Sequence, residues 1–464
     1  MMFKRISIFV GALLFCLCTQ SKTIYVSSSE GTSQSKGLSA SAPVNTIAAA
    51  LTMGDTILLK AGDVFYEILE CDGKYISRYG EGHNPTLCGF KRIKQPCWEQ
   101  VEPNIWKLRL NSDNFTGFAA HVPYVNNIGC IYEYEKDQIH GRRLQLKNYL
   151  KENWDFCQTP SYKKDTPDSE FDDIYLYLET NPNTMQLEFS VGLSAAQIAN
   201  TTIDRVNFQG FGQGVVCKSN VTVSNCRIDL IGGRIFLGNR SFCCHGSGVV
   251  IEANGDVANC QVNDCYISRC YETGVSIAAS YQKEAEASNV SIAHNLIANC
   301  GRGFEAVMSS VVNTTFDNCV FASNTVLDSG NSGFTYSDKD FARCHVLLKY
   351  GMCQKNIMVD GNTFVKGNLC LSSVSQRNNL LSEWKNNTCY LLPTDMMIGN
   401  ADNNLHDAIS ISKVGKVKTA VKLFKEETGD KSTHFIVCDE MKIEKEIEGC
   451  GGEKVATLVN EKVQ

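Results

Sequence analysis

The sequence predicts an all-β solenoid, a chain wound into stacked coils, because two short patterns recur along its middle. In the first pattern an Asn opens a β-prone run, a Cys or Asn closes it six residues later, and an apolar side chain follows two residues further on. In the second pattern a glycine opens another β-prone run. Self-similarity at a period of roughly 20–50 residues is typical of repeat architectures. The first pattern begins at Asn220, Asn259, Asn289, Asn313 and Asn356, and the second at Gly214, Gly248, Gly274, Gly303 and Gly333.

The intervals between these runs are unequal, which excludes a tandem array of fixed repeat length and fits a coil whose turns accept loops. One coil cannot bury its inner face alone, so neighbouring coils stack ~4.8 Å apart with parallel strands. A residue that recurs at one corner then stacks on itself, which favours Asn or a small apolar Cys. We therefore predict that Cys226, Cys265 and Cys319 are stacked hydrophobic residues at such a corner. A zinc site is not expected, because the chain has no repeated CxxC or Cys/His pairing.

The opening of the chain carries a further signature. Tyr25, Pro43, Thr46, Ile47, Gly54, Asp55, Thr56 and Gly62 follow an order that is common at the start of β-helix enzymes. With the repeats, these residues resemble the right-handed parallel β-helix of the pectate-lyase-like superfamily, in its bacterial carbohydrate-active type. The resemblance implies a right-handed parallel β-helix, capped at its N-terminal end, but it does not identify the reaction.

Composition shifts divide the chain into five segments. Residues 1–21 read as a secretory signal, with Lys4 and Arg5 before an apolar run too short to span a bilayer as a mature helix. Cys16 and Cys18 keep a lipid anchor open as an alternative. We expect an N-terminal cap with the first coils over 22–90, an inserted β-subdomain over 91–190, the central β-helix over 191–392 and a C-terminal cap over 393–464. The expected location is outside the cell, in the periplasm or at the surface of a bacterial envelope.

The segment over 91–190 is rich in aromatic and charged residues. Trp154, Asp155, Tyr175, Tyr177, Asn181 and Pro182 resemble the inserted β-subdomain of several glycoside-cleaving β-helix proteins. That resemblance makes Trp154 a candidate sugar-binding residue. Trp98 and Trp106 are equally well explained as packing residues. Near the C-terminus, the segment from Lys416 to Lys431 has the apolar spacing of a short amphipathic helix.

Alternation within the glycine-led strands predicts which side chains face a ligand. Residues one and three after the glycine are apolar or small and should face inward, which turns Val250, Ser276, Glu305 and Glu252 outward. Long segments interrupt the coils at 228–248, 278–288 and 339–354, at both edges of these strands. Loops gathered on one face of a solenoid often mark its binding face. A formal net charge of −6 gives no basic surface for nucleic acid. The resemblance to carbohydrate-active β-helix proteins implies a polysaccharide or oligosaccharide as the partner.

Our leading hypothesis is hydrolysis of a glycosidic bond by Glu305 and Glu252. Two carboxylates across a cleft suit this reaction, and an inverting pair needs roughly 6.5–9.5 Å between its carboxyl groups. Glu272, Arg302 and His245 stand where they would tune the pair, since a neighbouring Arg lowers the pKa of a carboxyl group. The substrate-binding candidates are Lys218, Tyr281, Arg240, Trp154 and Asp338. No cofactor is expected for hydrolysis.

Two alternatives stay open. In a lyase or epimerase acting on a uronic-acid glycan, Lys218 or Arg302 would abstract a proton while Ca²⁺ held by Glu252 and Glu305, with Asp338 as a third ligand, neutralised the substrate carboxylate. The sequence lacks the acidic cluster of pectate lyases and the NTD, DD, GHG and RIK set of polygalacturonases. The other alternative is a carbohydrate-binding surface protein without catalytic activity.

Overall fold

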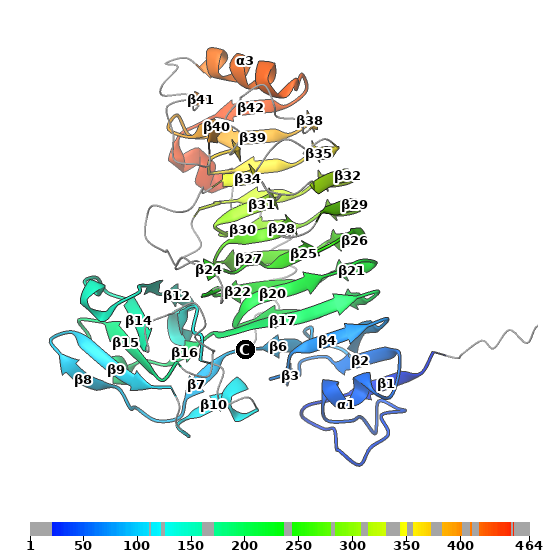
Figure 1. Ribbon diagram of the computed structural model, residues 1–464, viewed down its shortest axis with the longest axis vertical. Coiled ribbons are helices and arrows are strands. Elements are labelled where there is room, and N and C mark those ends of the chain that lie inside the picture. The colour runs from blue at the N-terminus through cyan, green and yellow to red at the C-terminus, as the bar shows by residue number, and fades with distance from the viewer. Residues whose placement is uncertain are drawn as a thin grey trace, which may run out of the picture.

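The protein is a right-handed parallel β-helix, as the computed structural model shows (Figure 1). The structure describes residues 21–110, 113–121, 126–159, 171–235, 244–279, 284–307, 314–330, 344–349, 356–372, 383–400, 409–410, 417–446 and 449. Three ten-stranded sheets, A, B and C, run along the stack, and each coil contributes a strand to each sheet. Within the described ranges no helix is long and apolar enough to cross a membrane.

The strands of the three sheets follow one another in sequence from coil to coil. Sheet A comprises β1 (Thr23–Val26), β2 (Thr56–Lys60), β5 (Tyr75–Tyr79), β18 (Thr202–Asp204), β21 (Val221–Ser224), β26 (Val257–Asn263), β29 (Ala285–Ala293), β32 (Thr314–Ala322), β35 (Ile357–Asp360) and β38 (Glu383–Lys385). Sheet B comprises β3 (Val64–Phe65), β6 (Thr86–Cys88), β19 (Asn207–Gln209), β22 (Arg227–Ile231), β27 (Tyr266–Cys270), β30 (Leu296–Ala298), β33 (Thr325–Leu327), β36 (Thr363–Val365), β39 (Thr388–Leu391) and β42 (His434–Val437). Sheet C comprises β4 (Leu69–Asp72), β17 (Val191–Ala199), β20 (Phe211–Cys217), β25 (Val249–Ala253), β28 (Thr273–Ala279), β31 (Arg302–Val307), β34 (Cys344–Lys349), β37 (Cys370–Ser372), β40 (Met396–Asn400) and β41 (Ile409–Ser410).

The predicted alternation in the glycine-led strands is confirmed for the strands that the structure describes. Val249, Ile251, Val275, Ile277 and Phe304 are at most 1% exposed and belong to one continuous apolar core along the stack. Burial of this inner face is the main stabilising contribution in such a stack, at about 25 cal/mol per Å² of apolar surface.

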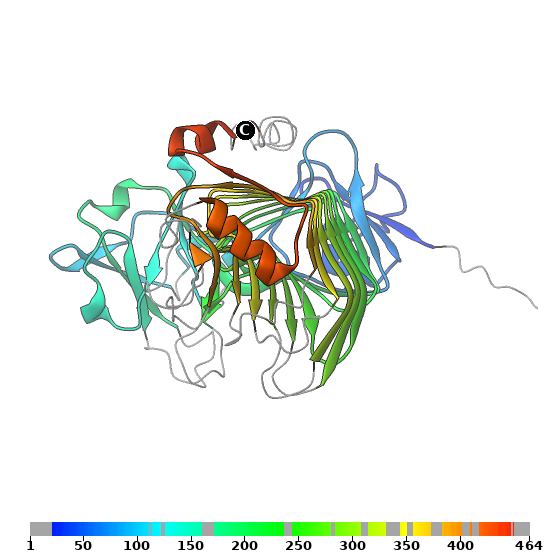
Figure 2. The ribbon, with the colours of Figure 1, turned by 90° about the horizontal axis from the view of Figure 1, so that it is seen from above.

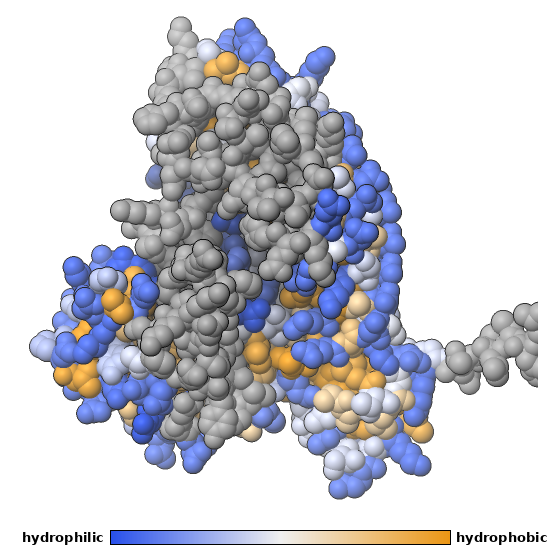
Figure 3. Space-filling view, viewed as in Figure 1, coloured by the Kyte–Doolittle hydropathy of each residue, from blue (hydrophilic) through white to orange (hydrophobic). Residues whose placement is uncertain are grey.

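Two asparagine ladders hold the corners of the coils. Asn220, Asn259, Asn289 and Asn318 have positive φ values of 49–60° and pass side-chain hydrogen bonds of 2.9–3.3 Å from coil to coil at the exposed edge. This edge is hydrophilic in the space-filling view (Figure 3). A second, buried ladder links Asn295, Asn324, Asn362 and Asn387 through amide bonds of 3.0–3.1 Å. Left-handed backbone and amide stacking explain the predicted preference for Asn.

The fourth repeat of the Asn pattern was placed wrongly. Asn318, and not Asn313, pairs across from Asn289, so the run closes at Asn324 rather than at Cys319. Asn313 itself lies outside the described residues. The sequence presents two Asn residues five positions apart, and only strand pairing decides which of them stacks on the preceding coil.

A second correction concerns the strand that follows β31. The predicted strand from Gly333 lies outside the described residues, and the neighbour of β31 is instead β34, which comes from the segment 339–354 that we expected to be a loop. Val346 and Leu348 of β34 are fully buried in the core. The two candidates have similar alternation, so pattern alone did not separate them.

The cysteines whose side chains the structure describes are free thiols. Cys226 and Cys265 occupy the predicted corner, and Asn295 takes the same place in the next coil, where its Oδ1 accepts a 2.9 Å bond from the Cys265 amide. Cys319 is buried too, but inside sheet A opposite Val290 and not at the corner. Burial raises the pKa of the Cys319 thiol to about 12.

The described residues between 91 and 190 form two five-stranded sheets beside the stack, and we call the segment 91–190 the insert (Figure 2). Trp98 and Trp106 are 6% and 9% exposed in the core between these sheets, so they are packing residues. The first sheet comprises β7 (Lys91–Ile93), β10 (Phe115–Gly117), β11 (Ile131–Glu133), β12 (Gln138–His140) and β16 (Leu187–Phe189); the second comprises β8 (Glu99–Glu102), β9 (Ile105–Arg109), β13 (Arg142–Arg143), β14 (Asp155–Thr159) and β15 (Asp173–Tyr177). Short 3-10 turns at Phe118–Ala120, Tyr134–Lys136, Lys147–Tyr149 and Pro182–Thr184 complete it.

Helices cover both ends of the stack. Near the N-terminus, α1 (Ile47–Leu51) is capped by Thr46, whose hydroxyl accepts a bond from the Ala49 amide. At the other end α3 (Val417–Thr428) lies across the coils (Figure 2). Its Phe424 is fully buried, with ring centroids 5.8 Å from Trp384 and 5.1 Å from Phe435. Covering the apolar ends blocks further strand addition.

Candidate functional site

A row of polar side chains interrupts the apolar packing at the outer face of sheet C. Arg302, at the start of β31, bonds through Nη1 to Oε2 of Glu305 and lies 3.4 Å from Oε1 of Glu272. The hydroxyl of Ser276 donates a 2.7 Å bond to the other oxygen of Glu305. All four side chains are buried, with residue exposures of 1–8%. Buried charges are costly unless paired, so this arrangement is an ordered network rather than a solvated surface.

His245 extends the row toward solvent. It lies on β24 (Cys244–His245), which forms a two-stranded ribbon with β23 (Arg234–Ile235). Its Nδ1 is 3.5 Å from Oε2 of Glu272, and 41% of its side chain is exposed. The same carboxylate oxygen accepts a 3.2 Å bond from the Gly246 amide. The carboxylate therefore orients an imidazole that is partly exposed to solvent.

The charges in this row fix the protonation of Glu272. Burial by itself raises the pKa of its carboxyl group, but the charge and hydrogen bond of His245, the Arg302 guanidinium and the Gly246 amide outweigh burial and hold the pKa at about 2. For Arg302, burial lowers the pKa and the two carboxylates raise it, with a net rise. Glu272 therefore stays ionised over the whole functional pH range, and it cannot donate a proton to a leaving group.

Small residues allow the coils to approach closely at this site. A Cβ added at Gly301 would lie 2.5 Å from the carbonyl oxygen of Glu272, and one at Gly303 would lie 2.7 Å from the carbonyl oxygen of His345. The amide of Arg302 bonds to that same Glu272 carbonyl at 2.6 Å. Thr273, the strand partner of Arg302, is fully buried, and its Oγ1 has no hydrogen-bond partner within the described part of the chain.

The structure does not bring the predicted pair Glu252 and Glu305 together. In the strand register Glu305 is aligned with Ser276 and Val250, whereas Glu252 is two residues further along β25. Two strand spacings and two residues put their Cα atoms roughly 12 Å apart. Arg302 also draws the Glu305 carboxylate away from Glu252, which is exposed. The carboxylate that the fold brings to Glu305 is Glu272, with Arg302 between them.

The other predicted residues are spread more widely. Lys218 is exposed just beyond β20, beside Glu252. Trp154 stacks on His140 with ring centroids 3.7 Å apart, so one of its faces is already covered. Tyr281, Arg240 and Asp338 lie outside the described residues.

Ser276 is a site residue that the sequence reasoning missed. It occupies the same outward position as Glu305 on the preceding coil, which was the signal available to find it. Within the described ranges no three His, Cys, Asp or Glu side chains come together as a metal site.

No model of a protein family matches the chain, and no curated protein is similar enough to match. Among solved structures, XylC in complex with xylose is 13% identical, with a TM-score of 0.39, over 89% of this chain and 82% of that chain. A GH136 lacto-N-biosidase from Eubacterium ramulus is also 13% identical, with a TM-score of 0.39, over 90% of this chain and 68% of that one. An alginate lyase from Paenibacillus sp. str. FPU-7 is 10% identical, with a TM-score of 0.35, over 79% and 95%. At such low similarity the reaction has to be inferred from the site itself.

Proposed function

We propose that this protein is a secreted enzyme that cleaves glycosidic bonds of a polysaccharide at the outer face of sheet C. The observation that carries the proposal is the exposed imidazole of His245 held by the ionised carboxylate of Glu272. A proton-transfer group that is both oriented and accessible is what acid–base cleavage requires. Secretion is part of the proposal and follows from the signal-like residues 1–21.

In the proposed hydrolysis, the imidazolium of His245 gives its proton to the leaving glycosidic oxygen. Glu305 is the second carboxylate, and it takes a proton from a water molecule whose oxygen bonds to the anomeric carbon as the glycosidic C–O bond breaks. The contacts form a row in which Glu272 and Arg302 lie between His245 at one end and Glu305 at the other. This placement suits an acid and a base on opposite sides of one bond. Arg302 and Ser276 keep the Glu305 carboxylate oriented.

The test is a panel of glycans incubated with the purified protein and read for new reducing ends and for the ultraviolet absorbance of unsaturated products. Reducing ends without absorbance are the expected result, and His245→Gln should abolish them. His434→Gln is the matched control, because His434 is an exposed histidine on β42, far from the site. Absorbance together with reducing ends would replace hydrolysis by elimination on a uronic-acid glycan. Binding without either signal on a broad panel would favour a non-catalytic carbohydrate-binding protein.

A further inference from the structure

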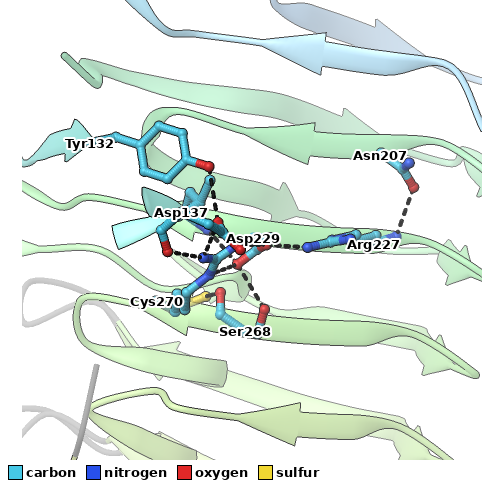
Figure 4. A network of polar contacts seen from close by, with 9 residues as sticks. Tyr132, Asp137, Asn207, Arg227, Asp229, Ser268 and Cys270 are labelled. Atoms are coloured by element: carbon cyan, nitrogen blue, oxygen red, sulfur yellow. Dashed lines mark hydrogen bonds and ion pairs between the residues drawn. The ribbon is translucent and has the colours of Figure 1, made fainter. Parts of the chain in front are cut away.

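The insert meets the coils at a buried ion network on the outer face of sheet B (Figure 4). Asp229 on β22 is 2% exposed and accepts hydrogen bonds from Ser268 at 2.7 Å and Arg227 at 2.6 Å. Arg269 donates hydrogen bonds to both carboxylate oxygens of Asp229, from Nε at 2.8 Å and from Nη2 at 2.5 Å. Burial raises the pKa of the Asp229 carboxyl, but the two guanidinium groups outweigh burial and hold it well below its usual range.

Arg269 also reaches the insert. Its Nη1 donates to Oδ1 of Asp137 at 2.6 Å and to the Asp137 carbonyl oxygen at 3.3 Å. Asp137 follows the 3-10 turn Tyr134–Lys136 with a φ of 51°, and the Tyr132 hydroxyl donates to the same Oδ1 at 2.9 Å. The guanidinium of Arg269 is rigid and planar, so its two hydrogen bonds to Asp229 fix its orientation. That orientation determines where Asp137, and with it the insert, can bind.

The chain runs from this contact into the functional site within three residues. Tyr271 packs in one apolar cluster with Tyr132 of the insert and with Phe90, which directly precedes the insert. On its other side, a Cβ at Gly233 or Gly246 would come within 2.9 Å of Tyr271, so the ribbon that carries His245 lies directly against this side chain. Glu272 follows Tyr271, and its amide bonds to the Gly246 carbonyl at 2.9 Å.

The geometry points to Asp137 of the insert as a positioning residue for the Glu272–His245 pair. Through Arg269 it fixes the end of β27, and the insert then holds Tyr271 against the ribbon, so that the carboxylate and the imidazole are presented to each other. This inference rests on the proposed role of His245 as the proton-transfer group. The insert then helps to position the catalytic pair and is not only an addition to the surface of the coils.

The test is acylation of His245 by diethyl pyrocarbonate, which reacts with the neutral imidazole, followed by peptide mass spectrometry from pH 5 to 8. Glu272→Gln measures how far the carboxylate shifts the titration midpoint of His245. Asp137→Asn should shift the midpoint downward by a part of that amount, giving about two- to threefold faster acylation at pH 6 for a shift of 0.3–0.5 pH units. The rate at pH 8, well above the ordinary imidazole pKa of about 6.5, should change much less. Glu135→Gln is the matched control, since it removes an exposed carboxylate two residues away.

A downward shift in Asp137→Asn, repeated in Arg269→Lys and absent from Glu135→Gln, is the expected result. An unchanged midpoint in Asp137→Asn overturns the inference. A faster reaction at every pH also overturns it, because the insert would then merely shield His245. If Glu272→Gln leaves the midpoint in place, there is no working pair to position and the inference fails with it. If the midpoint responds as expected but no glycan is cleaved, the inference stands and the proposed function fails.

Discussion

Replacing Arg302 by Met should destabilise the protein strongly at neutral pH and much less in mild acid. Arg302 lies between Glu272 and Glu305, and all three are at most 8% exposed. Removing one partner of a buried ion pair costs about 3–5 kcal/mol, because the remaining charge stays buried. A carboxyl pKa of about 2 for Glu272, against 4.5 as its ordinary value, contributes about 3 kcal/mol of stability above pH 4.5. In the wild type this contribution is lost as the pH falls from 4.5 through 2.

In the Met variant the pH dependence of stability at this site has the opposite sign. Glu272 and Glu305 then face each other without the guanidinium, and at least one of them gains affinity for a proton. Its stability deficit relative to the wild type should therefore shrink as the pH falls from 7 to 5. Urea denaturation at both pH values measures this difference. Arg109→Met is the control: Arg109 is 70% exposed beside Asp172, so less than about 1 kcal/mol is expected. A deficit below 1 kcal/mol at pH 7, or one that is the same at pH 5, would refute the reasoning.

Two further predictions concern the coils and a third concerns the insert. His345 is fully buried, and burial lowers its pKa to about 3. Below pH 6.5 only the unfolded chain takes up the proton, so the free energy of unfolding of the wild type should fall by about 2 kcal/mol between pH 7.5 and 5. Denaturation of His345→Gln at the two pH values should lack this decrease. Asn324→Ala breaks a buried ladder and should cost about 2–4 kcal/mol in denaturant, whereas Asn318→Gly in the exposed ladder should cost less than about 1; equal costs would contradict the distinction. Cys97 is exposed, and although partial burial raises the pKa of its thiol, it should react with a thiol reagent before the buried thiols do. Cys97→Ser should therefore remove one early-reacting thiol, and an unchanged count would contradict this.

The repeated patterns were enough to predict the fold, because a solenoid repeats a local structure. Apolar alternation after each glycine places Val249, Ile251 and Phe304 in the core, independently of the loops. An Asn at a corner with left-handed backbone is recognisable in any coil. The same locality explains the helix at Val417–Thr428, whose apolar spacing predicted it. The site could be predicted in part, since the sequence analysis includes its charged residues among the candidates: Glu305, Glu272, Arg302 and His245.

Which of these candidates contact one another depends on how the coils pack. The strand register between coils aligns Glu305 with Ser276 and leaves Glu252 aside, and a register depends on loop lengths that the sequence pattern does not measure. The same ambiguity misplaced Asn318 and the strand β34, because equally good patterns lay a few residues apart. The grip of Arg269 on Asp137 joins residues 132 positions apart. Contacts of that kind come from packing and not from local pattern, and they bring the insert up against the site.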